Sequence, residues 1–206
     1  DHFGFEVEDV ETVYARLHAK YPKIKVLHRP GGRSFAGIST HDPAGNVFDL
    51  SKGVGKRRGV YEEGEWQQER HLSHLALRAV SPELLAEFYV EVFELAALEK
   101  PADDPNTYLT DGRLTFTIMP WDITDYLGSG IERPALDHLG FQVESVAAFQ
   151  KDLDALIDRD PSLATKRARK SDEGDARQRL FSSCPHGKLH LADPDGVLID
   201  VTDGSR

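Results

Sequence analysis

Apolar and polar residues alternate in three stretches of the chain, and each stretch precedes a run with apolar residues at helical spacing. The alternating stretches are residues 1–7, 71–80 and 136–143, and this period of two is typical of half-buried β-strands. Each helical run begins after a residue whose side chain can accept a hydrogen bond from the helix N-terminus: Asp9, Ser81 and Ser145. The pattern therefore predicts a strand followed by a helix, three times.

Short apolar runs separated by turn residues follow each predicted helix, and they predict further strands. These strands are expected at residues 24–28, 34–39 and 46–50, then near 96–100, at 106–110 and at 113–119, and finally around 179–183, 188–192 and 197–202. The strand near 96–100 is the least resolved by the pattern. Each of the three units therefore has the order β-α-β-β-β.

The first and third units also share their sequence. Asp-His-Phe-Gly-Phe-Glu-Val-Glu at the start of the chain matches Asp-His-Leu-Gly-Phe-Gln-Val-Glu at residues 137–144, so that His2 corresponds to His138. Each copy continues to a turn that contains Asp-Pro and then to a strand that carries an acid, Asp49 or Asp200. A repeat of one supersecondary unit predicts a repeated fold.

The repeat divides the chain into three parts. Residues 1–52 form one module that stands alone, residues 53–70 are predicted to be a linker, and residues 71–206 form a complete two-module domain with a charged insertion at 162–179. We interpret the lone module as the second half of an N-terminal domain whose first half is missing, because the chain opens directly on the repeated strand. Its unpaired sheet predicts self-association or instability, and we expect a homo-oligomer.

Composition and charge argue against several classes of protein. A net charge of −10 disfavours a nucleic-acid-binding protein, which needs a basic face. The basic run at 166–170 is followed by acids and is predicted to be solvated. No apolar run approaches the ~18 residues of a membrane helix. Cys184 is the only cysteine, so an internal disulfide is impossible and the cytoplasm is the expected compartment.

Three features together resemble the vicinal oxygen chelate superfamily, which includes glyoxalase I, bleomycin-resistance proteins and extradiol dioxygenases. They are His74 on an opening strand, Asp-His-Leu-Gly-Phe-Gln-Val at 137–143, and Asp-Pro-Asp-Gly-Val-Leu-Ile-Asp at 193–200. The resemblance implies an α+β fold in which two β-α-β-β-β modules pair into one cupped mixed sheet with flanking helices. The superfamily spans many reactions, and fold alone does not give function.

In this superfamily the metal ligands come from the opening and closing strands of each module. Carried over to this chain, these positions are His74, a residue near 115–117, His138 and Asp200, but the segment 113–119 contains no acid, amide or histidine. Two imidazoles and one carboxylate suit Fe(II) or Mn(II) and leave coordination positions for a substrate. The alternative is that both histidines are structural and that the site holds no metal.

Two further histidines are candidates for acid–base chemistry. Extradiol dioxygenases carry a tyrosine three residues before the Asp-Pro turn and a histidine further upstream, whereas this chain has His190 at the first position and no histidine at 181–183. His190 is our candidate catalytic residue, since an imidazole titrates near neutral pH. His186, on a Pro-His-Gly turn, is the second candidate. An exposed polar role is the alternative for both.

The resemblance implies a metal-dependent enzyme that acts on a small substrate through two neighbouring oxygens, with extradiol-like ring-cleaving dioxygenation as the leading reaction. A lyase or isomerase of the glyoxalase type is the alternative enzyme. A metal-free protein that binds a small molecule or confers resistance is the alternative without catalysis. His2 and Asp49 would supply half of a second site or survive as a structural remnant.

Two other features have simpler structural interpretations. The segment at 193–196 suggests a calcium loop, but it lacks the further ligands of such a loop and is better explained as a turn. Trp121 and Tyr126 are predicted to be core residues in preference to contacts for an aromatic substrate.

Overall fold

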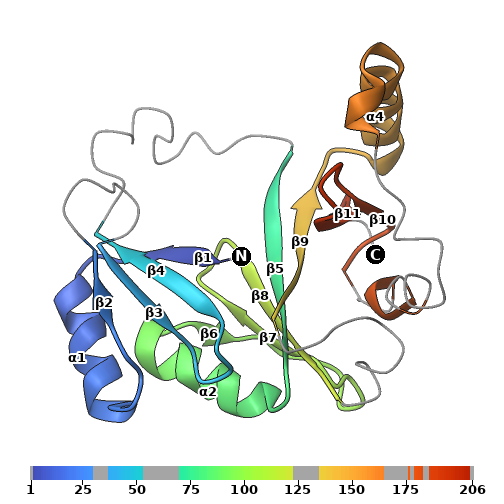
Figure 1. Ribbon diagram of the computed structural model, residues 1–206. Helices are drawn as coiled ribbons and strands as arrows, with labels where there is room; N and C mark the ends of the chain where they lie inside the picture. The colour runs from blue at the N-terminus through green and yellow to red at the C-terminus, as the bar shows by residue number, and fades with distance from the viewer. Residues whose placement is uncertain are drawn as a thin grey trace.

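The computed structural model describes residues 2–29, 37–52, 70–122, 135–164, 176, 179–182 and 186–204. Within them the chain forms the predicted α+β fold, in which two mixed β-sheets are combined with α-helices (Figure 1). Residues 53–69 of the predicted linker, the basic run at 166–170, Tyr126 and Cys184 lie outside these ranges. None of the described helices combines the length and the apolar character needed to cross a bilayer.

The first module forms a four-stranded sheet. Its elements are β1 Phe3–Glu6, α1 Val10–Lys20, β2 Leu27–His28, β3 Ile38–His41 and β4 Val47–Ser51. The strand order is β1-β4-β3-β2, with β1 parallel to β4 and the other pairs antiparallel. Asp9 caps α1 as predicted, because its carboxylate accepts hydrogen bonds from the backbone N–H groups of Glu11 and Thr12.

The second and third modules share one seven-stranded sheet, with the strand order β10-β11-β9-β5-β8-β7-β6. Their elements are β5 His71–Ala79, α2 Pro82–Phe93, β6 Ala96–Ala97, β7 Thr107–Thr110, β8 Thr115–Pro120, β9 Leu136–Gln142, α4 Val146–Arg159, η2 Pro161–Leu163, β10 Leu189–Ala192 and β11 Leu198–Thr202. The opening strands β5 and β9 are antiparallel and adjacent. The two modules therefore meet at the strands that carry His74 and His138.

Ser81 is the N-cap residue of α2 and Pro82 is its first residue, as predicted, although the Ser81 side chain makes no capping hydrogen bond. One local prediction is wrong. Residues 179–182 are helical and not a strand, so the described part of the third module adds β9, β10 and β11 to the sheet. A run of four residues is too short for its periodicity to separate helix from strand. Tertiary packing selects the helix at this segment, because the helical turn places Phe181 in the core at 1% exposure.

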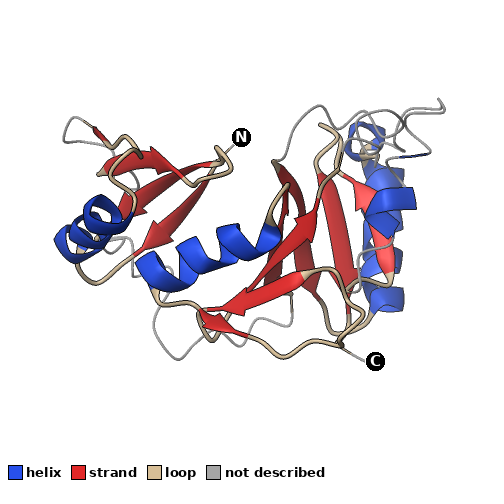
Figure 2. Cartoon of the chain, turned by 90° about the horizontal axis from the view of Figure 1, so that it is seen from below, coloured by secondary structure: helices blue, strands red, loops and turns tan. Residues whose placement is uncertain are grey.

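The first module does not stand apart in space, because its sheet shares a hydrophobic core with α2 of the second module. Phe5 stacks on Phe93 with ring centroids 4.2 Å apart, and Phe48 lies 6.2 Å from Phe88. In Figure 2 helix α2 lies between the four-stranded and the seven-stranded sheet. One apolar face of the first module is therefore covered from within the chain.

A buried hydrogen bond crosses this shared core and makes a testable contribution to stability. Tyr89 donates to Asp42 Oδ2 at 2.6 Å, both residues are fully buried, and burial raises the pKa of Tyr89 well above its usual range. We expect Tyr89→Phe to lower the free energy of unfolding in urea by about 1.5–3 kcal/mol, the range for a hydrogen bond to a charged group.

The control is Tyr21→Phe, which removes a similar bond to Glu91 Oε2 (2.9 Å) near the surface. Because water can replace the lost partner there, we expect it to cost less than about 1 kcal/mol. Equal costs for the two variants would contradict a special role for the buried pair.

Candidate metal centre

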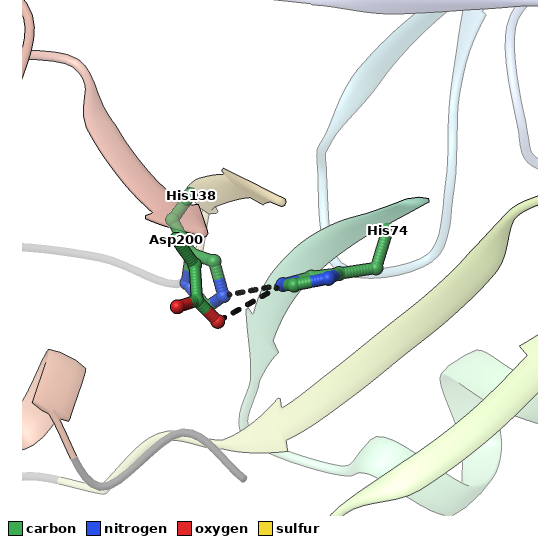
Figure 3. Close-up of side chains that lie close together, drawn as sticks. All are labelled: His74, His138 and Asp200. Atoms are coloured by element: carbon green, nitrogen blue, oxygen red, sulfur yellow. Dashed lines mark hydrogen bonds and ion pairs between the residues drawn. The ribbon is translucent and has the colours of Figure 1, made fainter. Parts of the chain in front are cut away.

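Three neighbouring strands bring His74, His138 and Asp200 together on one face of the seven-stranded sheet. His74 of β5 and Asp200 of β11 are both paired with Gly140 of the central strand β9. Cross-strand partners point to the same face of a sheet, and His138 lies two residues before Gly140, so it shares that face. Figure 3 shows the three side chains converging.

The ligand-type atoms of these three residues lie close together in a dry environment. His74 Nε2 is 3.2 Å from His138 Nε2 and 3.4 Å from Asp200 Oδ2, and one ligand atom from each residue lies within 4.8 Å of the others. All three residues are at most 2% exposed. Bonds of about 2.1 Å from one divalent ion would put its ligands about 3–3.5 Å apart, so the spacing fits a shared metal ion.

The carboxylate of Asp200 supports the same interpretation. Both of its oxygens are buried, and neither has a hydrogen-bond partner among the described residues. A buried charge without hydrogen bonds is strongly destabilising unless a counter-charge is present. The two histidine nitrogens and the carboxylate together form a donor set that a divalent cation would complete.

Two β-bulges place a side chain on the far nitrogen of each histidine. The β5–β9 ladder shifts its register between Leu72 and His74 and again between Ala76 and Leu77, which leaves Ser73 and Asp137 as the extra residues. Ser73 Oγ lies 3.2 Å from His74 Nδ1, and Asp137 Oδ1 lies 2.7 Å from His138 Nδ1. Bulges redirect side chains in this way beside functional sites.

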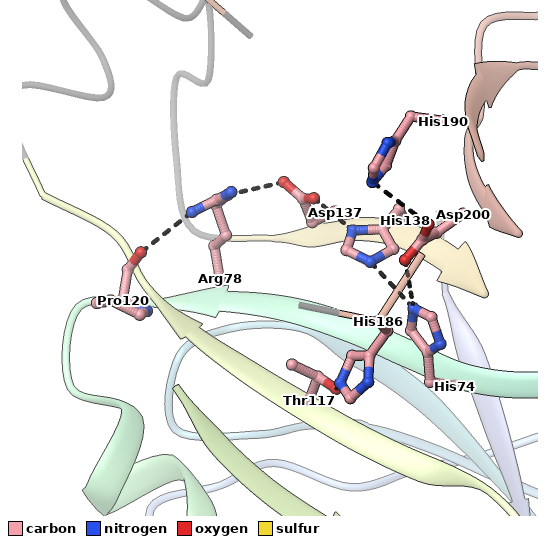
Figure 4. A network of polar contacts seen from close by, with 9 residues as sticks. All are labelled: His74, Arg78, Thr117, Pro120, Asp137, His138, His186, His190 and Asp200. Carbon is pink, nitrogen blue, oxygen red and sulfur yellow. Dashed lines mark hydrogen bonds and ion pairs between the residues drawn. The ribbon is translucent and has the colours of Figure 1, made fainter. Parts of the chain in front are cut away.

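Asp137 also fixes the tautomer of His138. Burial alone would raise the pKa of Asp137, but the hydrogen bond from His138 and the charge of Arg78 outweigh it, so that the pKa is lowered. Arg78 Nε donates to Asp137 Oδ2 at 2.7 Å (Figure 4). Since the ionised carboxylate only accepts, His138 Nδ1 must donate, so that the tautomer of the neutral ring that can bind a metal has its lone pair on Nε2, which faces His74 and Asp200.

Two glycines, which have no side chain, make room for the side chains of His74 and Asp200. A Cβ on Gly140 would lie 1.9 Å from the ring of His74, and a Cβ on Gly187 would lie 1.2 Å from Asp200 Oδ1. Real side chains essentially never approach so closely. Both positions therefore require glycine for the present placement of His74 and Asp200.

The two candidate acid–base histidines lie on either side of this cluster. His190 is paired with Asp200 across β10 and β11, its Nε2 is 3.4 Å from Asp200 Oδ1, and this nitrogen has no hydrogen-bond partner in the described part of the chain. The His186 ring lies 4.7 Å from that of His74, and its Nε2 is 3.1 Å from Thr117 Oγ1. Burial and then the neighbouring His74 lower the pKa of His186 to about 4, so His186 is neutral at pH 7.

A pocket of about 510 Å³ reaches the cluster from one end of the cup. His74, His186 and Gly187 form part of its lining, together with residues from β5, β8, β9 and β11. This volume is in the range of small-molecule sites. The pocket therefore provides a route to the cluster.

The corresponding positions of the first module form a weaker, more exposed version of the site. His2 Nε2 lies 3.4 Å from Asp49 Oδ2, with the two side chains 49% and 14% exposed. Unlike Asp200, Asp49 accepts a hydrogen bond from Ser39, which in turn accepts one from Arg29. The carboxylate is thus satisfied within the module, which favours a structural remnant over half of a second site.

The segment at 193–196 has the expected structure. Asp193 Oδ1 accepts from the backbone N–H groups of Asp195 and Val197, both at 2.9 Å, and Gly196 has φ +92°. The segment is therefore the predicted turn. Trp121, directly after β8, is only partly buried and does not belong to the described hydrophobic core, so its predicted core role is not confirmed.

Comparison with solved structures places the fold. A mutant of 4-hydroxymandelate synthase from Streptomyces coelicolor has a TM-score of 0.57 at 16% identity, over 97% of this chain and 69% of that one. The 2,3-dioxygenase LapB from Pseudomonas sp. KL28 has a TM-score of 0.60 at 18% identity, and the match covers 98% of this chain and 70% of LapB. A Mn(II)-bound glyoxalase from Novosphingobium aromaticivorans has a TM-score of 0.59 at 15% identity, and the match covers 96% of this chain and 60% of the glyoxalase.

The resemblance to the vicinal oxygen chelate superfamily is thereby confirmed for the fold. No protein-family model matches the chain, and no curated protein matches it either. The chain spans between 60% and 70% of the length of the three structures named above.

Proposed function

We propose that this protein is a metal-dependent enzyme that acts on a small substrate through two neighbouring oxygens, with extradiol-like dioxygenation as the leading reaction. His74, His138 and Asp200 bind Fe(II) or Mn(II). The observation that carries the proposal is the buried Asp200 carboxylate, which has no hydrogen-bond partner in the described part of the chain and faces two histidine nitrogens. An arrangement of this kind is costly without a cation.

The surrounding residues prepare the site for chemistry. Asp137 and Arg78 hold His138 with its Nε2 lone pair directed inward. When bound, the metal supplies Lewis acidity and open positions for the substrate oxygens. His190 Nε2 is positioned to accept a proton from a substrate hydroxyl, because it lies beside Asp200 and has no other hydrogen-bond partner among the described residues.

The first test is elemental analysis of protein purified without chelator. We expect about one Fe or Mn per chain, lost in His138→Ala. His2→Ala is the matched control, because His2 holds the corresponding position of the first module, where Asp49 is already hydrogen-bonded. Oxygen uptake with catechols after anaerobic reconstitution with Fe(II) then tests the reaction. An absence of metal in every preparation, even after reconstitution, would favour a metal-free binding protein.

A lyase or isomerase of the glyoxalase type is the second candidate, and one observation favours it. Residue 190 is histidine where extradiol dioxygenases carry tyrosine, and it lies beside the cluster. A histidine there suits proton transfer at a carbon next to a metal-bound carbonyl. Metal-dependent exchange of a substrate proton with solvent, without oxygen uptake, would select this alternative.

A further inference from the structure

The pocket that leads to the metal centre has an unusual lining. Small-molecule sites are lined mainly by apolar and aromatic side chains, whereas all the lining residues that belong to the described part of the chain are polar, charged or glycine. Thr115, Gln142 and His74 are examples. Among the described residues, a substrate with an alkyl chain or a second apolar ring would find no apolar side chain here to cover it.

The charge of the lining is opposite to that of the protein. The chain has a net charge of −10, yet the described lining residues include Arg113 and Lys188 and no residue with a carboxylate. Lys188 Nζ is paired with Asp203 Oδ1 at 2.9 Å. The guanidinium of Arg113 forms no ion pair with any described residue. A cleft that concentrates positive charge in this way attracts anions.

The position of Arg113 is set by the turn that carries it. Asp111 Oδ1 accepts hydrogen bonds from the backbone N–H groups of Arg113 and Leu114, both at 2.8 Å. This turn leads directly into β8, which is paired with β5, and Thr115 of β8 is the register partner of His74. The turn that carries Arg113 therefore leads into the strand adjacent to the one that carries His74, the candidate ligand that lines the pocket.

We propose that the substrate carries a carboxylate in addition to its two neighbouring oxygens, and that Arg113 binds this carboxylate at the mouth of the pocket. The inference rests on the proposed function, because it assumes that the neighbouring oxygens reach the metal. Arginine suits the task, since its planar guanidinium matches a carboxylate with two parallel hydrogen bonds. Arg113 thereby selects acids over neutral chelators of the same shape.

The test compares two catechols, one with a free carboxylate and one in which a methyl ester removes its charge. Zn(II)-loaded protein, which is redox-inert, is titrated calorimetrically with 3,4-dihydroxybenzoate and with its methyl ester. We expect the acid to bind at least about tenfold more tightly, the factor at the lower end of the range for hydrogen bonds to a charged group. In Arg113→Met the acid should lose this advantage, while the affinity of the ester stays unchanged. Lys151→Met, an exposed lysine of α4, is the control for net charge and should behave as the wild type.

The outcomes separate this inference from the proposed function. Equal binding of acid and ester in the wild type, or a preference that survives Arg113→Met, overturns the role of Arg113 and leaves the metal site intact. Failure of both probes to bind protein that contains one Zn(II) per chain contradicts chelation itself, and with it both proposals. A preference that disappears in Arg113→Met but not in Lys151→Met supports the inference.

Discussion

Gly140→Ala is expected to abolish metal binding although it changes no ligand. The added methyl group would lie 1.9 Å from the His74 ring, which is itself buried. Because Gly140 sits between His74 and Asp200 in the same row of the sheet, the ring must leave the position from which it faces the other two ligands. We expect the affinity for Mn(II), measured by calorimetry, to fall at least ~100-fold, the upper end of the loss seen when a supporting partner is removed.

The first module supplies a matched control for this substitution. Gly4 occupies the position that corresponds to Gly140, but a Cβ there would meet only the Asp49 carbonyl oxygen, at an ordinary distance of 3.6 Å. Gly4→Ala should therefore leave both metal affinity and folding nearly unchanged. Unaltered Mn(II) binding by Gly140→Ala would show that His74 is not a ligand.

The three candidate ligands could be named from the sequence because the resemblance to the vicinal oxygen chelate superfamily implies ligands on the opening and closing strands of each module. Alternation gives the face of each residue on its own strand only, and the internal repeat relates His138 and Asp200 to His2 and Asp49. The structure brings the three side chains together. Their roles as ligands remain a proposal, which the metal analysis tests.

The supporting residues could not be found in this way. Ser73 and Asp137 contact the histidines because each is the extra residue of a β-bulge, and a bulge interrupts the alternation on which the sequence argument depends. Arg78 reaches Asp137 from 59 positions away in the chain. Phe181 packs against His138 from a helical turn that was predicted as a strand. In each case tertiary packing overrides the local pattern.

Asp200→Asn is expected to have opposite effects on stability and on metal binding. In chelator the wild-type protein buries a carboxylate without hydrogen bonds, and the neutral amide removes that charge at almost constant volume. We expect the variant to gain about 1–3 kcal/mol in the free energy of unfolding, as when other buried charges are replaced. At a Mn(II) concentration 100 times the Kd, the wild type should gain about 2.7 kcal/mol and the variant nothing.

Urea denaturation with and without Mn(II) measures both effects, and Asp49→Asn is the control. Asp49 is partly exposed and already accepts a hydrogen bond from Ser39, so its replacement should not stabilise the metal-free protein. A loss of stability in metal-free Asp200→Asn would mean that the carboxylate is the structural partner of a protonated histidine. The buried Asp200 carboxylate would then not destabilise the metal-free protein, and a metal-free binding site would explain the cluster better. A gain in chelator that falls by about 2.7 kcal/mol in Mn(II) is the result that a metal site requires and a structural ion pair cannot produce.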